Sequence, residues 1–238
     1  MTVVALIVAG GSGERLGREG GKQMLEIAGR PVLARTVDAF ERSTSVDAIV
    51  VVAHPDRVAE YRTGAVDVVG SRKVIAVVPG GASRQESVSC GLGALPDDAD
   101  VVLVHDGARP AVTPELVDGV VRTLTENGEL DGVVVGHPVY DTLKLVDESG
   151  MVVGTADRSA FWAAQTPQVF RADVLRGAYT RAAALGETGT DDAALVERAS
   201  GRVAMYLGPR TNLKVTVAED VAMLTSVLDA GETRGTDG

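Results

Sequence analysis

Five short apolar runs, rich in β-branched residues, recur along the first 136 residues of this chain, and the segments between them have helical character. The runs are VVALIVA (3–9), AIVVVA (48–53), KVIAVV (73–78), DVVLVH (100–105) and DGVVVG (131–136). Uninterrupted apolar strands are typical of a parallel sheet that helices cover on both faces. The alternation therefore predicts an α/β fold with a doubly wound, Rossmann-like, mostly parallel sheet flanked by helices.

Helix-start signals lie between these runs. Pro31 opens RPVLARTVDAF, whose apolar residues recur at helical spacing, and Thr113 with Pro114 provides an N-cap and a first helical residue before ELVDGVVRTL. Later segments RADVLRGAYTRAAALGE, DDAALVERAS and AEDVAMLTSVLDA have helical patterns, while VAMYLG and LKVTV have strand patterns.

The regular alternation is interrupted between residues 139 and 157. Two alternating segments flank the turn sequence DESG, with Gly150 at the turn, which predicts a protruding β-hairpin arm. A two-stranded arm is marginally stable alone, so we expect it to pack on another surface, for example a second copy of the chain. We find no repeat and no linker, and therefore expect a single domain over 1–230 that includes the arm, followed by a disordered tail over 231–238.

Charge and cysteine content limit the classes of partner. The chain has 23 Lys and Arg against 33 Asp and Glu, a formal net charge of −10, which argues against a general nucleic-acid or acidic-membrane surface. Its single cysteine, Cys90, excludes an internal disulfide and a cysteine-based zinc site and suits a reducing cytoplasm. The apolar start breaks into glycines after about eight residues and lacks a basic leader, so we interpret it as a strand of a soluble protein.

A glycine-rich turn follows the first apolar run and contains Arg15 and Lys22. A dinucleotide fingerprint and a Walker A loop both require glycine where this chain has Leu16, and a Walker A loop also requires Ser or Thr where it has Gln23. Backbone amides in such a turn form a concave anion site, and cations from the same loop can surround a polyphosphate. A tight turn with two solvated charges is the alternative, but the whole pattern favours phosphate binding.

Seven blocks along the chain carry a specific resemblance. AGGSGERLGREGGKQ resembles the signature loop of sugar-phosphate nucleotidyltransferases, and the remaining blocks resemble the 2-C-methyl-D-erythritol 4-phosphate cytidylyltransferase family over nearly the whole chain. Those blocks are GGASRQESV (80–88), VLVHDGARP (102–110), DTLK (141–144), AFWAAQTPQVF (160–170), TDDAALVE (190–197) and NLKVT (212–216). Two positions depart from the family pattern: Gly21 stands where proline is common, and Gly107 stands where alanine is usual.

The resemblance implies transfer of CMP from CTP to methylerythritol phosphate with release of pyrophosphate. Such a reaction depends on positioning and charge neutralisation and needs no protein nucleophile. The resemblance assigns charge stabilisation to Arg15, Lys22 and Lys214. It places the nucleotide against Ala9, Gly10, Gly11, Gly13, Gly81, Ser87, Asp106 and Gly107, and the acceptor against Arg109, Thr142, Arg158, Thr166 and Thr190.

Two further expectations concern a metal and a partner subunit. Asp106 follows a buried central strand, where ligands bind in open α/β sheets, and a hard carboxylate there suits Mg²⁺ bridging the phosphates. In the family, the hairpin arm crosses a dimer interface, and the residues that match Thr142 and Arg158 help to hold the acceptor in the neighbour's site. The resemblance therefore implies a homodimer in which each arm completes the other subunit's pocket.

Three alternatives remain open at this level. A cytidylyltransferase for another polyol phosphate, such as ribitol 5-phosphate, would share the CTP half of the site. An NAD-dependent oxidoreductase would need a complete third glycine and an acidic residue for the ribose. A non-catalytic nucleotide-binding regulator would not need Lys22, Asp106 and Lys214. We expect His105 to be structural, and Phe161 and Trp162 to belong to the core.

Overall fold

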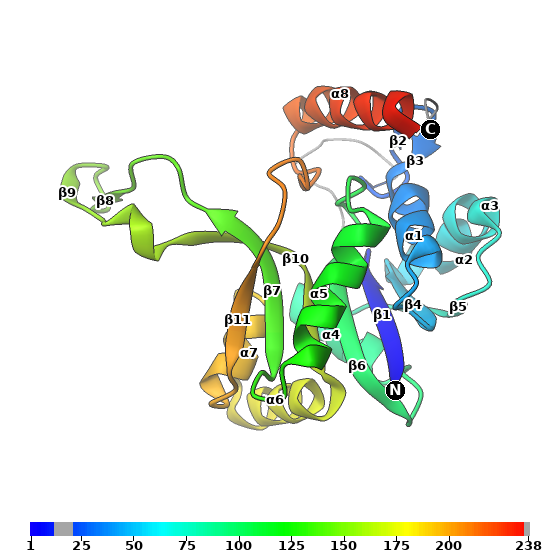
Figure 1. Ribbon diagram of the computed structural model, residues 1–238, viewed down its shortest axis with the longest axis horizontal. Coiled ribbons are helices and arrows are strands. Elements are labelled where there is room, and N and C mark those ends of the chain that lie inside the picture. The colour runs from blue at the N-terminus through cyan, green and yellow to red at the C-terminus, as the bar shows by residue number, and fades with distance from the viewer. Residues whose placement is uncertain (12–20, 236–238) are drawn as a thin grey trace.

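A seven-stranded sheet in the order β11-β7-β10-β6-β1-β4-β5 forms the centre of the computed structural model (Figure 1). The structure describes residues 1–11 and 21–235, with side chains as far as residue 230. The strands of this sheet are β1 (Thr2–Val8), β4 (Ala48–Ala53), β5 (Val74–Pro79), β6 (Ala99–Asp106), β7 (Gly132–Pro138), β10 (Trp162–Arg171) and β11 (Val203–Leu207). Two small hairpins are formed by β2 (Glu26–Ile27) with β3 (Arg30–Pro31) and by β8 (Lys144–Val146) with β9 (Val152–Thr155).

The longer helices connect the strands, and short helical turns complete the loops. The α-helices are α1 (Val32–Arg42), α2 (Val58–Tyr61), α3 (Asp67–Val69), α4 (Arg84–Leu92), α5 (Pro114–Glu126), α6 (Ala172–Leu185), α7 (Asp192–Arg198) and α8 (Ala218–Gly235). The short turns are η2 (Pro55–Arg57), η3 (Arg62–Val66) and η4 (Arg158–Ala160). None of the helices in the described part of the chain combines the length and the apolar character needed to cross a bilayer.

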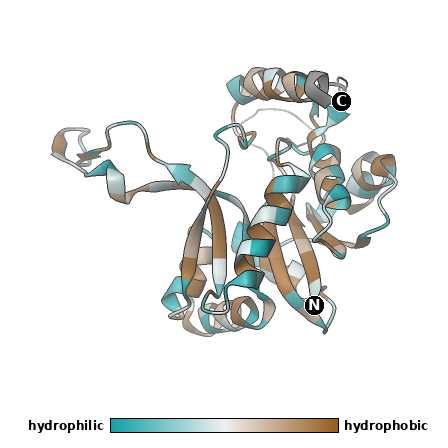
Figure 2. Ribbon diagram, viewed as in Figure 1, coloured by the Kyte–Doolittle hydropathy of each residue, from teal (hydrophilic) through white to brown (hydrophobic). Residues whose placement is uncertain are grey.

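Alternating side chains of the central strands explain the two helical layers. Val3, Ala5 and Ile7 of β1 belong to a buried cluster with α1 and α5. Val4 and Leu6 point to the opposite face, into a cluster with α4, α6 and α7. Since both faces are covered, central strands such as β1 and β4 are apolar along almost their whole length, as the brown strands of Figure 2 show. The predicted α/β fold with a mostly parallel sheet is confirmed.

The parallel register brings separate loops to one edge of the sheet. Val8 at the end of β1 lies level with Val52 of β4 and Asp106 of β6. The glycine turn after β1, the turn after β5 and the loop after β6 therefore emerge side by side. This is the edge at which open α/β sheets bind ligands.

Two predictions for the second half of the chain differ from the structure. β10 is the one antiparallel strand in the seven-stranded sheet and was not predicted. Its polar QTPQ segment (165–168) breaks the apolar pattern and contains a proline, which argues against a central strand. The expected strand LKVTV (213–217) is wrong, because this segment is an irregular connection; it is apolar because Val215 is buried beneath α8.

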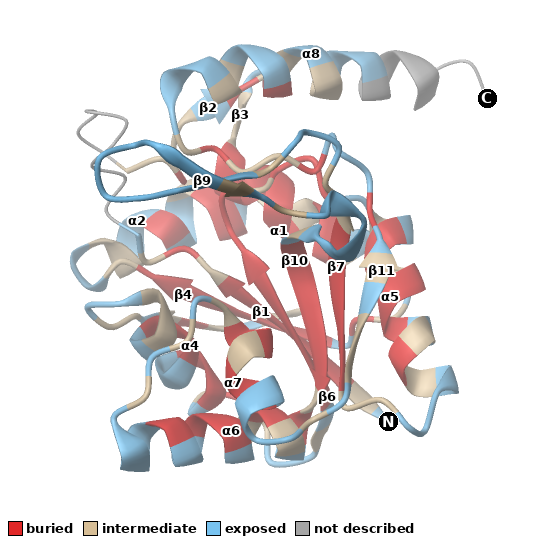
Figure 3. Ribbon diagram, turned by 90° about the vertical axis from the view of Figure 1, so that its left-hand side faces the viewer, coloured by how far each residue is buried: buried red, intermediate tan, exposed pale blue. Residues whose placement is uncertain are grey.

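The predicted hairpin arm is present and projects away from the sheet at the left of Figure 1. Gly150 has a φ of +82° in its turn, the left-handed conformation that glycine adopts without strain. Figure 3 shows the arm mostly in the colour of exposed residues. At its base, Phe161 and Trp162 are 46% and 38% exposed, so the expectation that they belong to the core is wrong.

Helix α8 lies across one end of the molecule, at the top of Figure 1, and covers the β2–β3 hairpin. Leu224 of α8 is buried with Ile27, Ala108 and Val215. The helix continues to Gly235, five residues into the segment expected to be a disordered tail. Residues 236–238 lie outside the described residues, and for them that expectation stays a prediction.

Candidate active site

A cleft of about 730 Å³ opens at the carboxyl edge of the sheet. Segments from five parts of the chain line it: the turn after β1, the loop after β4, the start of α4 with its preceding turn, the loop after β6, and the connection before α8 that carries Lys214. Its lining residues are Val8, Gly10, Gly11, Lys22, Gln23, His54, Pro55, Gly80, Gly81, Ala82, Ser83, Arg84, Ser87, Asp106, Ala108 and Lys214.

Most of the expected catalytic and nucleotide-binding residues that the structure describes line this cleft. They are Gly10, Gly11, Lys22, Gly81, Ser87, Asp106 and Lys214. Gly13 and Arg15 lie outside the described residues. Ala9 and Gly107 support the cleft from behind, because their N–H groups donate to the carbonyls of Val52 (2.7 Å) and Val8 (2.8 Å).

Ser87 explains the sequence of the second glycine turn. Its hydroxyl accepts a hydrogen bond from the Gly81 N–H at 3.2 Å and donates to the Ser83 carbonyl at 2.9 Å. A Cβ atom on Gly80 would lie 2.7 Å from the Ser87 oxygen, so the turn can approach α4 this closely only with glycine there. Ser83 caps α4 and forms a reciprocal capping box with Glu86. The backbone of this turn is therefore held rigidly at the cleft wall.

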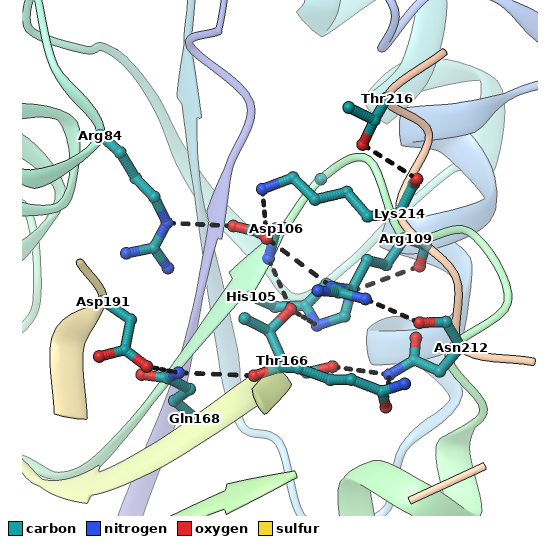
Figure 4. Close-up of polar contacts among 12 residues, drawn as sticks. Arg84, His105, Asp106, Arg109, Thr166, Gln168, Asp191, Asn212, Lys214 and Thr216 are labelled. Atoms are coloured by element: carbon teal, nitrogen blue, oxygen red, sulfur yellow. Dashed lines mark hydrogen bonds and ion pairs between the residues drawn. The ribbon is translucent and has the colours of Figure 1, made fainter. Parts of the chain in front are cut away.

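Asp106 lies at the centre of a cluster of three cations (Figure 4). The Lys214 ammonium is 2.8 Å from Oδ2, the Arg84 Nε is 3.1 Å from Oδ1, and the Arg109 Nε is 3.7 Å from Oδ2. Burial alone would raise the pKa of Asp106, but the charges of Arg84 and Lys214 outweigh burial and lower this pKa well below its usual range. Asp106 is therefore ionised at neutral pH.

Arg84 connects Asp106 to a second carboxylate that the sequence did not single out. Its Nη2 donates to Asp192 at 2.8 Å, and Asp192, which is fully buried, also accepts a hydrogen bond from the Tyr179 hydroxyl. Burial tends to lower the pKa of Arg84, and the charges of Asp192 and Asp106 raise it well above its ordinary value. Arg84 and Asp192 lie within two of the resembling blocks, but their pairing across more than 100 residues cannot be read from either block.

His105 and Thr166 fix the backbone beneath Asp106. The Thr166 hydroxyl accepts a hydrogen bond from the Asp106 N–H at 3.0 Å and lies 3.0 Å from His105 Nδ1. Because the Arg109 carbonyl, 3.4 Å from Nε2, can only accept, Nε2 carries the proton of neutral His105, and the Thr166 hydroxyl therefore donates to Nδ1. Burial lowers the pKa of His105 to about 3. Full burial and hydrogen bonds at both ring nitrogens are what we expect of a structural histidine.

The expected acceptor-binding residues lie in three places. Arg109 and Thr166 lie beside the cleft, where Arg109 donates to the Asn212 carbonyl at 2.8 Å and thereby holds the segment that carries Lys214. Thr142 and Arg158 belong to the arm, and Arg158 donates to the Tyr140 carbonyl. Thr190 precedes Asp191, which caps α7 by accepting from the Ala194 N–H. Within one chain, none of these five residues is among those that line the cleft.

The sequence of this chain is similar to those of known proteins over nearly its whole length. The family model described as "IspD: 2-C-methyl-D-erythritol 4-phosphate cytidylyltransferase" matches residues 3–230. The cytidylyltransferase of that name from Geobacter metallireducens is 45% identical over 226 residues, which cover 94% of this chain and 96% of that protein.

Solved structures agree with the sequence relatives. The 4-diphosphocytidyl-2C-methyl-D-erythritol synthase of Anaerococcus prevotii superposes with a TM-score of 0.82 at 28% identity, covering 96% of this chain and 98% of that one. The 2-C-methyl-D-erythritol 4-phosphate cytidylyltransferase of Thermus thermophilus gives 0.74 at 32% identity, covering 95% and 98%. Sequence and fold agree over almost the entire length, and the chain belongs to the 2-C-methyl-D-erythritol 4-phosphate cytidylyltransferase family.

Proposed function

We propose that this chain transfers a cytidylyl group from CTP to 2-C-methyl-D-erythritol 4-phosphate in the cleft at the carboxyl edge of its sheet, as an enzyme of non-mevalonate isoprenoid biosynthesis. The observation that carries the proposal is the convergence of Lys22, Arg84 and Lys214 on one cleft with Asp106. A phosphate oxygen of the acceptor attacks the α-phosphorus of CTP, and the bond from that phosphorus to the oxygen that bridges to the β-phosphorus breaks. The electron pair leaves with pyrophosphate.

The residues of the cleft suit this displacement because they supply charge and backbone donors rather than a nucleophile. Lys22 and Lys214, together with Arg15, stabilise the negative charge that builds on the α-phosphate and the leaving pyrophosphate. The turns at Gly10–Gly11 and Gly80–Gly81 allow the nucleotide to approach the backbone, with Ser87 holding the second turn. Arg109, Thr142, Arg158, Thr166 and Thr190 are the proposed acceptor contacts.

The carboxylate of Asp106 suits a magnesium ion that is bound together with the substrate. Asp106 is the one carboxylate among the described residues that line it, and the described part of the chain holds no group of three or more metal-ligating side chains. Mg²⁺ commonly binds to one or two carboxylates together with substrate phosphates and water. Asp106 would therefore hold an ion that also binds the triphosphate, and the ion would neutralise phosphate charge.

An assay of pyrophosphate release tests the reaction and its acceptor. With CTP and Mg²⁺, we expect release with methylerythritol phosphate and at least about tenfold lower kcat/KM with ribitol 5-phosphate, because a site that hydrogen-bonds one polyol leaves polar groups unpaired with another. A reversed preference would instead identify a ribitol phosphate enzyme. The absence of release with both acceptors, in a folded protein, would contradict a cytidylyltransferase.

We also propose a homodimer that forms through the hairpin arm, in a cytoplasmic setting consistent with one unpaired cysteine. Five apolar side chains of the arm are each more than half exposed: Leu145, Val146, Met151, Val152 and Val153. Apolar groups gathered on a projecting hairpin are typical of an interaction surface.

Substitution in the arm tests the dimer. Val152→Asp would place a charge in the proposed interface, and we expect it to weaken dimerisation at least about tenfold, because burying an unpaired charge is unfavourable. Sedimentation at several concentrations measures the effect, and activity should fall in parallel with the dimer fraction. Ile75→Asp is the matched control, since Ile75 is also about half exposed but lies on the edge strand β5. Equal dimerisation of both variants and the wild type would argue against this interface.

A further inference from the structure

Gln23 connects the two described ends of the first glycine turn. Its side chain is almost fully buried, and its Nε2 donates to the Gly11 carbonyl at 3.2 Å. The backbone carbonyl of Gln23 accepts a hydrogen bond from the Leu33 N–H at 2.9 Å, at the start of α1. The residue that directly follows Lys22 is thus joined both to the beginning of the turn and to the sheet-covering helix.

Tyr61 of α2 supports Gln23 from behind. The Tyr61 ring is fully buried, and its hydroxyl donates to Gln23 Oε1 at 3.3 Å. The Arg57 guanidinium lies 5.4 Å from the centre of that ring and is held by Glu60. The Gln23 amide nitrogen donates to Gly11, and its amide oxygen accepts from Tyr61. These two partners therefore determine the orientation of the amide.

Gly21, directly before Lys22, has a backbone conformation that makes the contacts of Gln23 and Tyr61 important for the position of Lys22. Its φ of +69° lies in the left-handed region, which proline cannot adopt because its ring fixes φ near −65°. A Cβ atom at Gly21 would lie 2.7 Å from Arg57 Nη1, 3.2 Å from Gln23 Oε1 and 3.3 Å from the Tyr61 oxygen. Glycine restricts its own backbone less than any other residue, so the backbone before Lys22 needs a constraint from its neighbours.

We propose that Gln23 and Tyr61 are positioning residues that supply this constraint: together they hold Gly11 and the backbone of Lys22 at the CTP cleft. Gly11, Lys22 and Gln23 itself line that cleft, and the Gln23 side chain donates to the Gly11 carbonyl. This inference rests on the proposed function, since the ligand whose affinity it controls is CTP. Neither residue is assigned any contact with the reacting atoms.

Calorimetric titration of CTP into the full-length protein without acceptor tests the inference. Tyr61→Phe removes one hydroxyl and preserves the ring, and we expect it to weaken CTP binding about three- to tenfold, as expected when one hydrogen bond is lost. Gln23→Ala should weaken CTP binding further, and Gly21→Pro should do so because its backbone cannot take the left-handed conformation. Tyr206→Phe is the matched control on β11, at the far edge of the sheet, and should bind CTP like the wild type.

The thermal midpoint of each variant separates positioning from folding. The inference predicts a midpoint for Tyr61→Phe close to that of Tyr206→Phe together with weaker CTP binding, and in turnover a rise in KM for CTP larger than the fall in kcat. Wild-type affinity in folded Tyr61→Phe and Gln23→Ala, or tighter binding by Gly21→Pro, would overturn it. If the wild type itself bound no CTP, the proposed function would fail instead, and the two failures are therefore distinguishable.

Discussion

Asp106→Asn is expected to reduce Mg²⁺-dependent kcat/KM by at least about 10³-fold, because a bound metal contributes several kcal/mol to charge stabilisation and each 1.36 kcal/mol is tenfold in rate. The substitution preserves shape and removes the carboxylate charge at the centre of the cation cluster. Arg84, Lys214 and Arg109 would then lose the counter-charge that they share. Steady-state turnover over a range of Mg²⁺ concentrations measures the loss.

The same substitution has an opposite expected effect on metal-free binding. With one negative charge fewer among three cations, Asp106→Asn should bind CTP more tightly than the wild type when Mg²⁺ is chelated. A purely structural Asp106 would give weaker CTP binding both with and without metal. The signs of the two changes therefore separate a metal-holding role from a packing role.

Asp118→Asn provides a matched control for Asp106→Asn. Asp118 of α5 binds Ser43, Thr44 and Ser45 outside the cleft, and although burial opposes the shift, these hydrogen bonds lower its pKa to about 2. Loss of its charge should cost about 1–3 kcal/mol of unfolding free energy and leave the Mg²⁺ dependence unchanged. If Asp118→Asn and Asp106→Asn changed the metal dependence equally, the role of Asp106 would be refuted.

The pH for these measurements follows from the depressed pKa of Asp106. A carboxylate with a lowered pKa stabilises the fold fully above its ordinary pKa, near 4, and that stabilisation is lost as pH falls through the depressed value. Between pH 6 and 8 Asp106 is fully ionised, and His105, with its pKa near 3, stays neutral. The comparison with asparagine in this range therefore isolates one unit of charge.

Local patterns in the sequence were sufficient for the parallel strands of the sheet and for the position of Asp106 and the glycine turns at its carboxyl edge. The apolar runs that became β1, β4, β5, β6 and β7 were identified because burial on both faces leaves no polar positions. Parallel pairing then determines that the turns after them share one edge, which is why Asp106 and the two glycine turns were expected there. Lys214 was found only through its resemblance to family members, since a lone lysine has no periodic signal.

The contacts that the sequence did not reveal depend on tertiary pairing. Asp192 can be buried because Arg84 balances its charge and both Arg84 and Tyr179 donate hydrogen bonds to it. Neither partner lies at a helix or strand spacing from Asp192, so no local pattern reveals the pairing. β10 was not predicted because its polar segment breaks the apolar pattern of a buried strand. That segment forms hydrogen bonds beside the cleft: the Thr166 hydroxyl accepts from the Asp106 N–H, and Gln168 donates to Asp191 at 2.8 Å. Local rules were therefore broken at the residues that build the active site, as expected where function competes with regular structure.

Lys22→Ala is expected to lower kcat by about 10²–10³-fold, the usual effect of removing one preorganised charge donor from a transition state. Lys22 and Lys214 both line the cleft, and Lys214 lies 2.8 Å from Asp106. In the proposed complex, the Lys22 ammonium stabilises the negative charge that builds on the phosphates during transfer. Pre-steady-state measurement of CMP transfer reports this step without interference from product release.

Two further variants determine whether the effect of Lys22→Ala is local. Lys22→Arg retains the charge with a different donor geometry and should recover part of the rate. Lys73→Ala removes a lysine that donates to the Ser43 carbonyl at 2.6 Å, away from the cleft, and should leave kcat within about twofold of wild type. Near-normal transfer by Lys22→Ala would exclude Lys22 from the mechanism and leave Lys214, Arg84 and the backbone amides to carry the charge of the departing pyrophosphate.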